Sequence, residues 1–141
     1  TMAKGMGNGF PIGGVLIHGD IKPWPGMLGT TFGGNYLAGA AGLAVLDVME
    51  KENLLANATQ MGTYLMAELI GVNQVQKLRG RGLMIGFDLA EENQQVRNNL
   101  LSKHRIFVGE AKPNTIRLLP SLTLNKSEID IFIDALKKEL P

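Results

Sequence analysis

The stretch that decides the fold is Thr1-Met2-Ala3-Lys4-Gly5-Met6-Gly7-Asn8-Gly9-Phe10-Pro11-Ile12-Gly13-Gly14. Its single lysine, Lys4, is followed by glycines at alternate positions, then by a proline and two more glycines. Alternating glycines disfavour a helix or a strand, because each adds backbone freedom that folding must remove. The pattern therefore predicts a tight turn with Lys4 at its mouth. A lysine amine in a partly desolvated pocket can lose its proton and attack a carbonyl carbon, so Lys4 is a candidate reactive group.

Two other glycine-rich loops are excluded by their spacing. A P-loop has its lysine after the glycines and followed by Ser or Thr, whereas Lys4 precedes them. The dinucleotide-binding fingerprint is G-x-G-x-x-G after a strand, whereas Gly7, Gly9 and Gly13 give G-x-G-x-x-x-G with no room for a strand before them.

A second segment with functional groups is Gly29-Thr30-Thr31-Phe32-Gly33-Gly34-Asn35, which precedes an expected helix. Hydroxyls and exposed backbone N–H groups at such a turn suit a phosphate, which makes Thr30 and Thr31 candidate ligands. The alternative is a plain glycine-rich turn with Asn35 as the helix N-cap, and both interpretations can hold together.

The third segment is Thr115-Ile116-Arg117-Leu118-Leu119-Pro120, an expected strand with one arginine inside an apolar run. Burying a guanidinium is costly unless an acid or a carbonyl pairs with it. A bidentate arginine–carboxylate pair is the usual way for an enzyme to hold an acidic substrate. The alternative is that Arg117 points off a sheet edge or makes a structural pair.

These segments resemble class III aminotransferases, which are fold-type I pyridoxal-phosphate enzymes. Residues 3–13 resemble A-K-x-x-G-x-G-x-P-x-G, residues 29–35 resemble G-[ST]-T-[FY]-G-G-N, and residues 116–122 resemble I-R-[FL]-x-P-[PS]-L. Residues 79–86 resemble R-G-x-G-L-M-x-G, which we interpret as structural. One departure is Tyr36, where the family commonly has proline.

The resemblance implies a role for each candidate residue. Lys4 would hold pyridoxal 5'-phosphate as a Schiff base and act in catalysis. Thr31, with Thr30 beside it, would bind the cofactor phosphate across the interface of a homodimer. Arg117 would contact the substrate carboxylate. No metal site is expected.

The implied fold is α/β, the C-terminal part of a fold-type I pyridoxal-phosphate-dependent transferase. Residues 1–50 would be a remnant of the large cofactor-binding domain, and residues 51–141 the small C-terminal α/β domain. The carboxylate for the pyridine nitrogen, the ring that stacks on the cofactor and most of the substrate tunnel would lie outside this chain. The chain alone is therefore expected to be inactive.

Within the family, the segments are most similar to acetylornithine and succinylornithine aminotransferases. The implied reaction moves an amino group from N-acetylornithine, N-succinylornithine or ornithine to 2-oxoglutarate, in arginine biosynthesis. The alternatives are another class III enzyme, such as an aminobutyrate-type aminotransferase or an aminomutase, and a non-catalytic fragment.

Composition excludes several other classes. The chain has 141 residues, a net charge of +1, no cysteine and two histidines. No basic block indicates nucleic acid, and no apolar run approaches the roughly 20 residues of a membrane span. The absence of cysteine is compatible with a cytoplasmic enzyme.

Hydrophobic periodicity predicts the remaining elements. Helices are expected over residues 36–49 (buried on most faces), 53–70, 91–103 (with Val96, Leu100 and Leu101 inward) and after Asn125. Strands are expected over residues 15–17, 75–78, 83–89, 106–108 and 115–119, with a turn at 79–82. His18 is expected to be a loop residue and His104 a solvated residue at a helix end.

Overall fold

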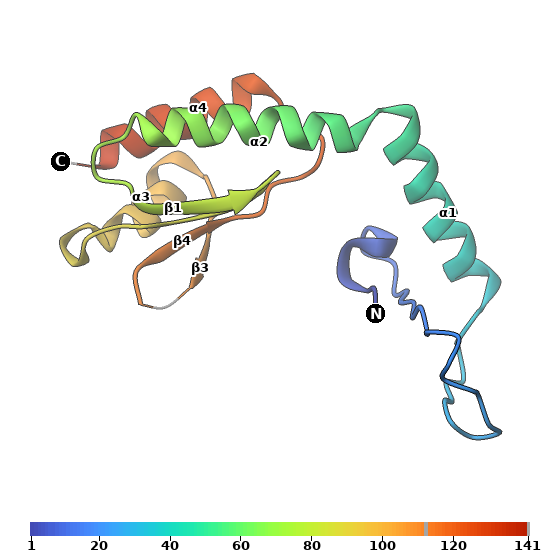
Figure 1. Ribbon diagram of the computed structural model, residues 1–141. Helices are drawn as coiled ribbons and strands as arrows, with labels where there is room; N and C mark the ends of the chain where they lie inside the picture. The colour runs from blue at the N-terminus through green and yellow to red at the C-terminus, as the bar shows by residue number, and fades with distance from the viewer. Residues whose placement is uncertain (112, 141) are drawn as a thin grey trace. The chain divides into compact units, whose positions relative to one another are not determined.

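The computed structural model describes residues 1–111 and 113–140 (Figure 1). The chain divides into two compact units, Thr1–Asn53 and Leu54–Pro141. Together they contain helices and a small antiparallel sheet, so the predicted α/β class is confirmed.

The second unit is built on a four-stranded antiparallel sheet in the order β1-β2-β4-β3. The strands are β1 (Gln76–Arg81), β2 (Met84–Asp88), β3 (Gly109–Ala111) and β4 (Thr115–Leu118). Along β2, Ile85 and Phe87 are fully buried whereas Met84 is 64% exposed. The predicted half-buried strand is therefore confirmed, and the sheet has one core face and one open face.

Helices cover the core face of this sheet (Figure 1). They are α2 (Leu54–Ile70), the short 3-10 helix η2 (Glu91–Asn93), α3 (Gln95–His104) and α4 (Lys126–Glu139). The helix expected after Asn125 is confirmed, and Asn125 and Glu128 form a capping box at its start, with both backbone-to-side-chain bonds at 3.0 Å. The largest fully buried side chains come from α2, β2, α3 and α4: Leu69, Ile85, Phe87, Leu100, Ile129 and Leu136.

The first unit contains a 3-10 helix, η1 (Lys4–Gly7), and the helix α1 (Tyr36–Lys51). Asn35 caps α1, because its side-chain oxygen accepts a hydrogen bond from the Ala38 amide at 2.9 Å. The expected helix is thus confirmed. Its expected burial is wrong, because only Ala38 and Gly42 are buried. Its exposed large apolar residues are Tyr36, Leu37, Leu43, Leu46 and Val48.

Two predicted strands are wrong. Residues 15–17 form no strand, and Leu16 is 84% exposed. A strand exists only by pairing, and the one bridge among the described residues of this unit joins Met2 and Gly14. Residues 106–108 also form no strand. The Ile106 amide instead closes the end of α3 by donating to the Leu100 carbonyl, after Arg105 adopts a left-handed conformation with φ 59°.

Three smaller expectations also differ from the structure. The expected turn at 79–82 is strand up to Arg81, because the hairpin turns at residues 82–83. Leu101 is 51% exposed, because it lies one residue past the stripe of Val96 and Leu100 on α3. His104 is not solvated: its side chain is 24% exposed and Nε2 lies 2.9 Å from Glu139 Oε1.

Candidate functional site

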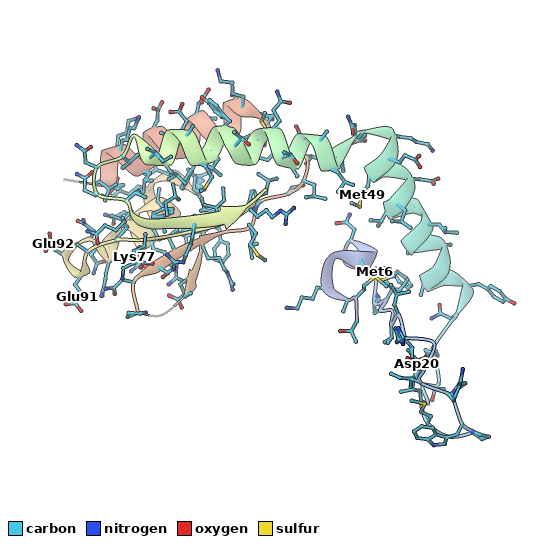
Figure 2. All side chains as sticks on the ribbon, in the orientation of Figure 1. Met6, Asp20, Met49, Lys77, Glu91 and Glu92 are labelled. Atoms are coloured by element: carbon cyan, nitrogen blue, oxygen red, sulfur yellow. The ribbon has the colours of Figure 1, made fainter. Side chains whose placement is uncertain are left out.

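Lys4 lies in a closed loop of the first unit. Met2 and Gly14 exchange two backbone hydrogen bonds of 2.7 and 2.9 Å, which brings the two ends of the loop together. Within the loop the chain reverses at Asn8 (φ 46°) and Gly9 (φ 98°). The predicted tight turn is therefore confirmed, and Lys4 is an exposed residue at its start. Figure 2 labels Met6, whose side chain lies over Gly14 in the same loop.

The backbone of Lys4 is itself unusual. Its φ is 56°, in the left-handed region that residues other than glycine rarely adopt. Such a conformation costs on the order of 1–3 kcal/mol and tends to occur at active sites, where the surrounding structure holds it. Asn8, Asn53, Lys77 and Arg105 also have positive φ, so the strained backbone adds to the motif at Lys4 but does not single out this residue by itself.

The loop packs against α1 where the side chain of Ile12 meets Gly42, and Gly7 contacts the same side chain within the loop. A β-carbon at Gly42 of α1 would stand 3.0 Å from Ile12 Cδ1, and one at Gly7 only 2.5 Å from Ile12 Cγ2. Since β-carbons do not approach that closely without displacement, both positions favour glycine. The glycines therefore serve a close approach, as the sequence pattern predicts.

The threonine segment forms the turn that enters α1. The Gly33 amide donates to the Thr30 carbonyl at 3.4 Å, and a β-carbon at Gly33 would lie 2.2 Å from Thr30 Cγ2. Thr30 lines an open hollow of about 600 Å³, together with residues 10–13, 32–35 and Ala38. The structure thus brings Thr30 and the second half of the Lys4 loop to one hollow. Neither Lys4 nor Thr31 lines it.

Arg117 belongs to the second unit, on the open face of β4. The expected strand is confirmed, since Ile116 and Leu118 are buried on the core face. Arg117 itself is exposed, not buried as the apolar run suggested. In the sheet register Arg117 lies between Gly86 of β2 and Gly109 of β3. Arg117 also lines a mostly apolar cavity of about 420 Å³ with Phe107, Leu119 and neighbouring residues.

A polar cluster that sequence reasoning missed lies on the same open face. Asp88 Oδ1 accepts hydrogen bonds from the Thr115 hydroxyl at 2.5 Å and from Arg79 Nη2 at 3.0 Å, and Lys77 Nζ lies 3.6 Å from Oδ2. The Thr115 bond and the two cations lower the pKa of Asp88 from its ordinary value. The alternation of β2 places Asp88 opposite the core face, but its partners come from other strands, which periodicity alone does not pair.

The sequence of residues 1–140 matches the sequence model of a protein family, described as aminotransferase class III. The chain belongs to this family. The resemblance found in the three segments is therefore confirmed, and it extends over both units.

Curated relatives of this class III aminotransferase chain carry a more specific name. Acetylornithine aminotransferase 1 of Bordetella bronchiseptica is 41% identical over 139 residues, covering 94% of this chain and 35% of that protein. Acetylornithine aminotransferase of Bifidobacterium longum is 36% identical over 146 residues, covering 100% of this chain and 34% of that protein. The chain thus spans about a third of the length of these relatives.

Solved class III structures have the same fold. Lysine aminotransferase from M. tuberculosis superimposes with a TM-score of 0.75 and is 34% identical, over 83% of this chain and 28% of that chain. An ornithine aminotransferase from Toxoplasma gondii, described with pyridoxal phosphate at its active site, gives a TM-score of 0.70 and 27% identity over 82% and 29%. The predicted fold, part of a fold-type I pyridoxal-phosphate enzyme, is confirmed, and pyridoxal phosphate is the cofactor of this family.

The residues present fit that cofactor in part. Lys4 offers an exposed amine, and Thr30 and Thr31 offer hydroxyls at a glycine-rich turn ahead of the N-terminus of α1. Among the described residues no cluster of His, Cys, Asp and Glu could hold a metal ion. No helix in the described part of the chain is long and apolar enough to cross a membrane.

Proposed function

We propose that the intact protein containing this chain transfers an amino group from N-acetylornithine to 2-oxoglutarate in arginine biosynthesis. N-succinylornithine and ornithine are the other donors that this proposal covers. Support comes from the two relatives named acetylornithine aminotransferase. The observation that carries the proposal is the strained backbone of Lys4, with φ 56°, at the start of the closed glycine loop.

Lys4 is the proposed catalytic residue. Pyridoxal phosphate, when bound, supplies an aldehyde that condenses with amines and a ring that draws electrons from the substrate carbon. Lys4 is the amine that would hold the cofactor in the resting protein. With substrate bound, Nζ of Lys4 would move the proton at the substrate carbon that bears the transferred amine, first as a base and then as an acid.

Thr30 and Thr31 are the proposed phosphate ligands. Both precede α1, whose first amides carry partial positive charge and favour an anion. Because Gly33 has no β-carbon, its backbone can lie close to the side chain of Thr30 in this turn. Thr31 is the residue proposed to reach the cofactor phosphate of a partner subunit, and its side chain is exposed at this turn.

Arg117 is proposed to hold the substrate carboxylate. Its guanidinium is exposed on the open face of β4, and no ion pair within residues 1–111 and 113–140 engages it. Gly109 lets the guanidinium of Arg117 lie close to the sheet, because a β-carbon there would stand 3.3 Å from Arg117 Nε. A planar guanidinium can donate two parallel hydrogen bonds to a carboxylate, which a lysine cannot do.

The proposal includes the organisation of the protein. Residues 1–50 are proposed to belong to a larger cofactor-binding domain and residues 51–141 to a small domain. We propose a homodimer in the cytoplasm, supported by the exposed apolar residues of α1, which a second copy or further polypeptide would cover. The chain alone is proposed to lack transaminase activity, because no carboxylate for the pyridine nitrogen can be assigned within it.

A different amino donor is the second candidate. The neighbour from M. tuberculosis acts on lysine by its name, with 34% identity to this chain. Aminobutyrate-type enzymes, aminomutases and a non-catalytic fragment remain alternatives at the same level. The deciding experiment is steady-state kinetics of the intact protein with N-acetylornithine, N-succinylornithine, ornithine and lysine, each with 2-oxoglutarate. A kcat/KM highest for lysine would replace the proposed donor.

A further inference from the structure

Asp88 is a carboxylate beside Arg117 on the open face of the sheet. Register pairs Asp88 with Thr115 and Gly86 with Arg117, so Asp88 and Arg117 are diagonal neighbours on one face of β2 and β4. Diagonal neighbours lie about 7–8 Å apart at the backbone, within reach of long side chains. If the carboxylate of Asp88 had no other partners, it would therefore compete with a substrate for the guanidinium of Arg117.

The carboxylate of Asp88 instead makes hydrogen bonds and ion pairs with other side chains. It accepts from the Thr115 hydroxyl at 2.5 Å and from Arg79 at 3.0 Å, with Lys77 at 3.6 Å. Its side chain is only 19% exposed, and these partners lie on the side of β1 and Thr115. The carboxylate thus has its charge balanced without Arg117.

A backbone irregularity brings both cations to Asp88. The register of β1 against β2 shifts between Gln76 and Arg79, and Lys77 in that bulge has φ 45°. In a regular strand, residues two apart share a face but lie nearly 7 Å apart. The bulge lets Lys77 and Arg79 converge on one carboxylate. Arg79 Nη1 also donates to the Lys77 carbonyl at 2.7 Å, which fixes the pair.

The other acid on these strands lies away from Arg117. Glu110 of β3 is in register with Ile116, so it lies on the helix-covered face, where it pairs with Arg97 of α3. Among the described strand residues, Asp88 is therefore the carboxylate in a position to reach Arg117.

We propose that Arg79 is a positioning residue that keeps Asp88 away from Arg117 and so leaves Arg117 free to bind a substrate carboxylate. Lys77 and Thr115 assist Arg79 by holding the same carboxylate. The inference rests on the proposed function of Arg117. It predicts that loss of Arg79 harms substrate binding through Asp88 and not through loss of a direct contact.

The test is steady-state kinetics on the intact, cofactor-loaded protein with N-acetylornithine and 2-oxoglutarate. In Arg79→Met, Asp88 would pair with Arg117. The KM of the substrate that Arg117 binds should then rise about three- to fivefold, the range of an exposed ion pair, with kcat nearly unchanged. The double variant Arg79→Met/Asp88→Asn should return KM to within about twofold of the parent value, because the competing charge is gone.

Three further variants make the result decisive. Arg97→Met removes a similar ion pair from the opposite face and should leave KM unchanged. Thr115→Val removes one of the groups that hold Asp88, with little change of shape. It should raise KM as well, and Asp88→Asn should again reverse the rise, so the test survives if Arg79→Met fails to fold. Arg117→Ala checks the proposed function separately, because an unchanged kcat/KM there would refute the role of Arg117 itself.

The inference is overturned if Arg117→Ala lowers kcat/KM but Asp88→Asn does not rescue Arg79→Met and Thr115→Val. Arg79 would then act as a direct ligand or a purely structural residue. An unchanged KM in both Arg79→Met and Thr115→Val would overturn it equally.

Discussion

Gly62 of α2 packs so closely on Gly82 of the β1–β2 turn that a β-carbon at position 62 would stand 2.3 Å from the Gly82 carbonyl oxygen. Alanine normally stabilises a helix interior relative to glycine by up to about 1 kcal/mol. Here Gly62→Ala should instead destabilise the protein by about 1–3 kcal/mol, because helix and turn must separate. Urea unfolding would measure this. The neighbouring exposed Thr63→Ala should be neutral or slightly stabilising, and an equal loss in both variants would contradict the packing argument.

The attachment of the cofactor to Lys4 can be tested chemically. Borohydride reduction of the cofactor-loaded intact protein, followed by peptide mapping, should place the pyridoxyl group on Lys4. Lys4→Ala should lower kcat by at least about 10²- to 10⁴-fold, the range of a lost acid–base group. Lys22→Ala, an exposed lysine of the same unit, is the control. A pyridoxyl group on any other lysine would reject the assignment.

The phosphate role of Thr31 predicts a change in cofactor affinity. Losing one hydrogen bond to a charged group costs about 1.5–3 kcal/mol. Thr31→Ala should therefore weaken retention of pyridoxal phosphate by roughly ten- to a hundredfold, as measured by equilibrium dialysis. Thr59→Ala is the control, because its hydroxyl donates to the Leu55 carbonyl within α2. Equal retention by Thr31→Ala and the control would reject the role.

The guanidinium of Arg117 should matter for its shape as well as its charge. Arg117→Ala should lower kcat/KM by a factor equivalent to about 2–5 kcal/mol, the usual effect of truncating one side of a desolvated charge pair. Arg117→Lys should still lose much of this affinity, because it lacks the planar fork. Kinetics with N-acetylornithine and 2-oxoglutarate would show whether both variants keep the parent kcat/KM, the result that makes Arg117 structural.

Glu139 predicts a dependence of stability on pH. Hydrogen bonds from Lys103 and His104 lower the pKa of Glu139 from its ordinary value. A depressed carboxylate pKa adds stability above the unfolded pKa, and this stability is lost as the pH falls through the folded pKa. Glu139→Gln should thus lower the urea midpoint at pH 7, with the difference vanishing at acidic pH below that folded pKa. Asp134→Asn, exposed on the same helix, should show no such trend.

Much of the second unit follows from local patterns. Apolar residues repeat at helical spacing along α2 and α4 and at every second position along β2. These patterns predict which side chains enter the core, and the observed core confirms the prediction. The wrong predictions concern segments whose structure depends on a hydrogen-bonding partner elsewhere in the chain. Residues 15–17 are apolar enough for a strand but have nothing to pair with among the described residues, and the amide of Ile106 is taken by the end of α3.

The sequence predicts which residues are candidates for the site but not their surroundings. The glycine spacing pointed to Lys4, yet nothing in the sequence gave its left-handed backbone. The position of Arg117 in an apolar run suggested burial, whereas the period of two places it on the open face. The set of side chains that bind the Asp88 carboxylate depends on the strand order and on a bulge in β1, and neither can be derived from periodicity.

The bulge in β1 has a second consequence, for self-association. Unpaired edge strands act as templates for aggregation, and proteins blunt them with charges, bulges or short length. The β1 edge carries both a bulge and the cations Lys77, Arg79 and Arg81, while the opposite edge, β3, is only three residues long. The bulge that brings Lys77 and Arg79 to Asp88 therefore also disfavours edge-to-edge pairing of this sheet with the sheet of a second copy.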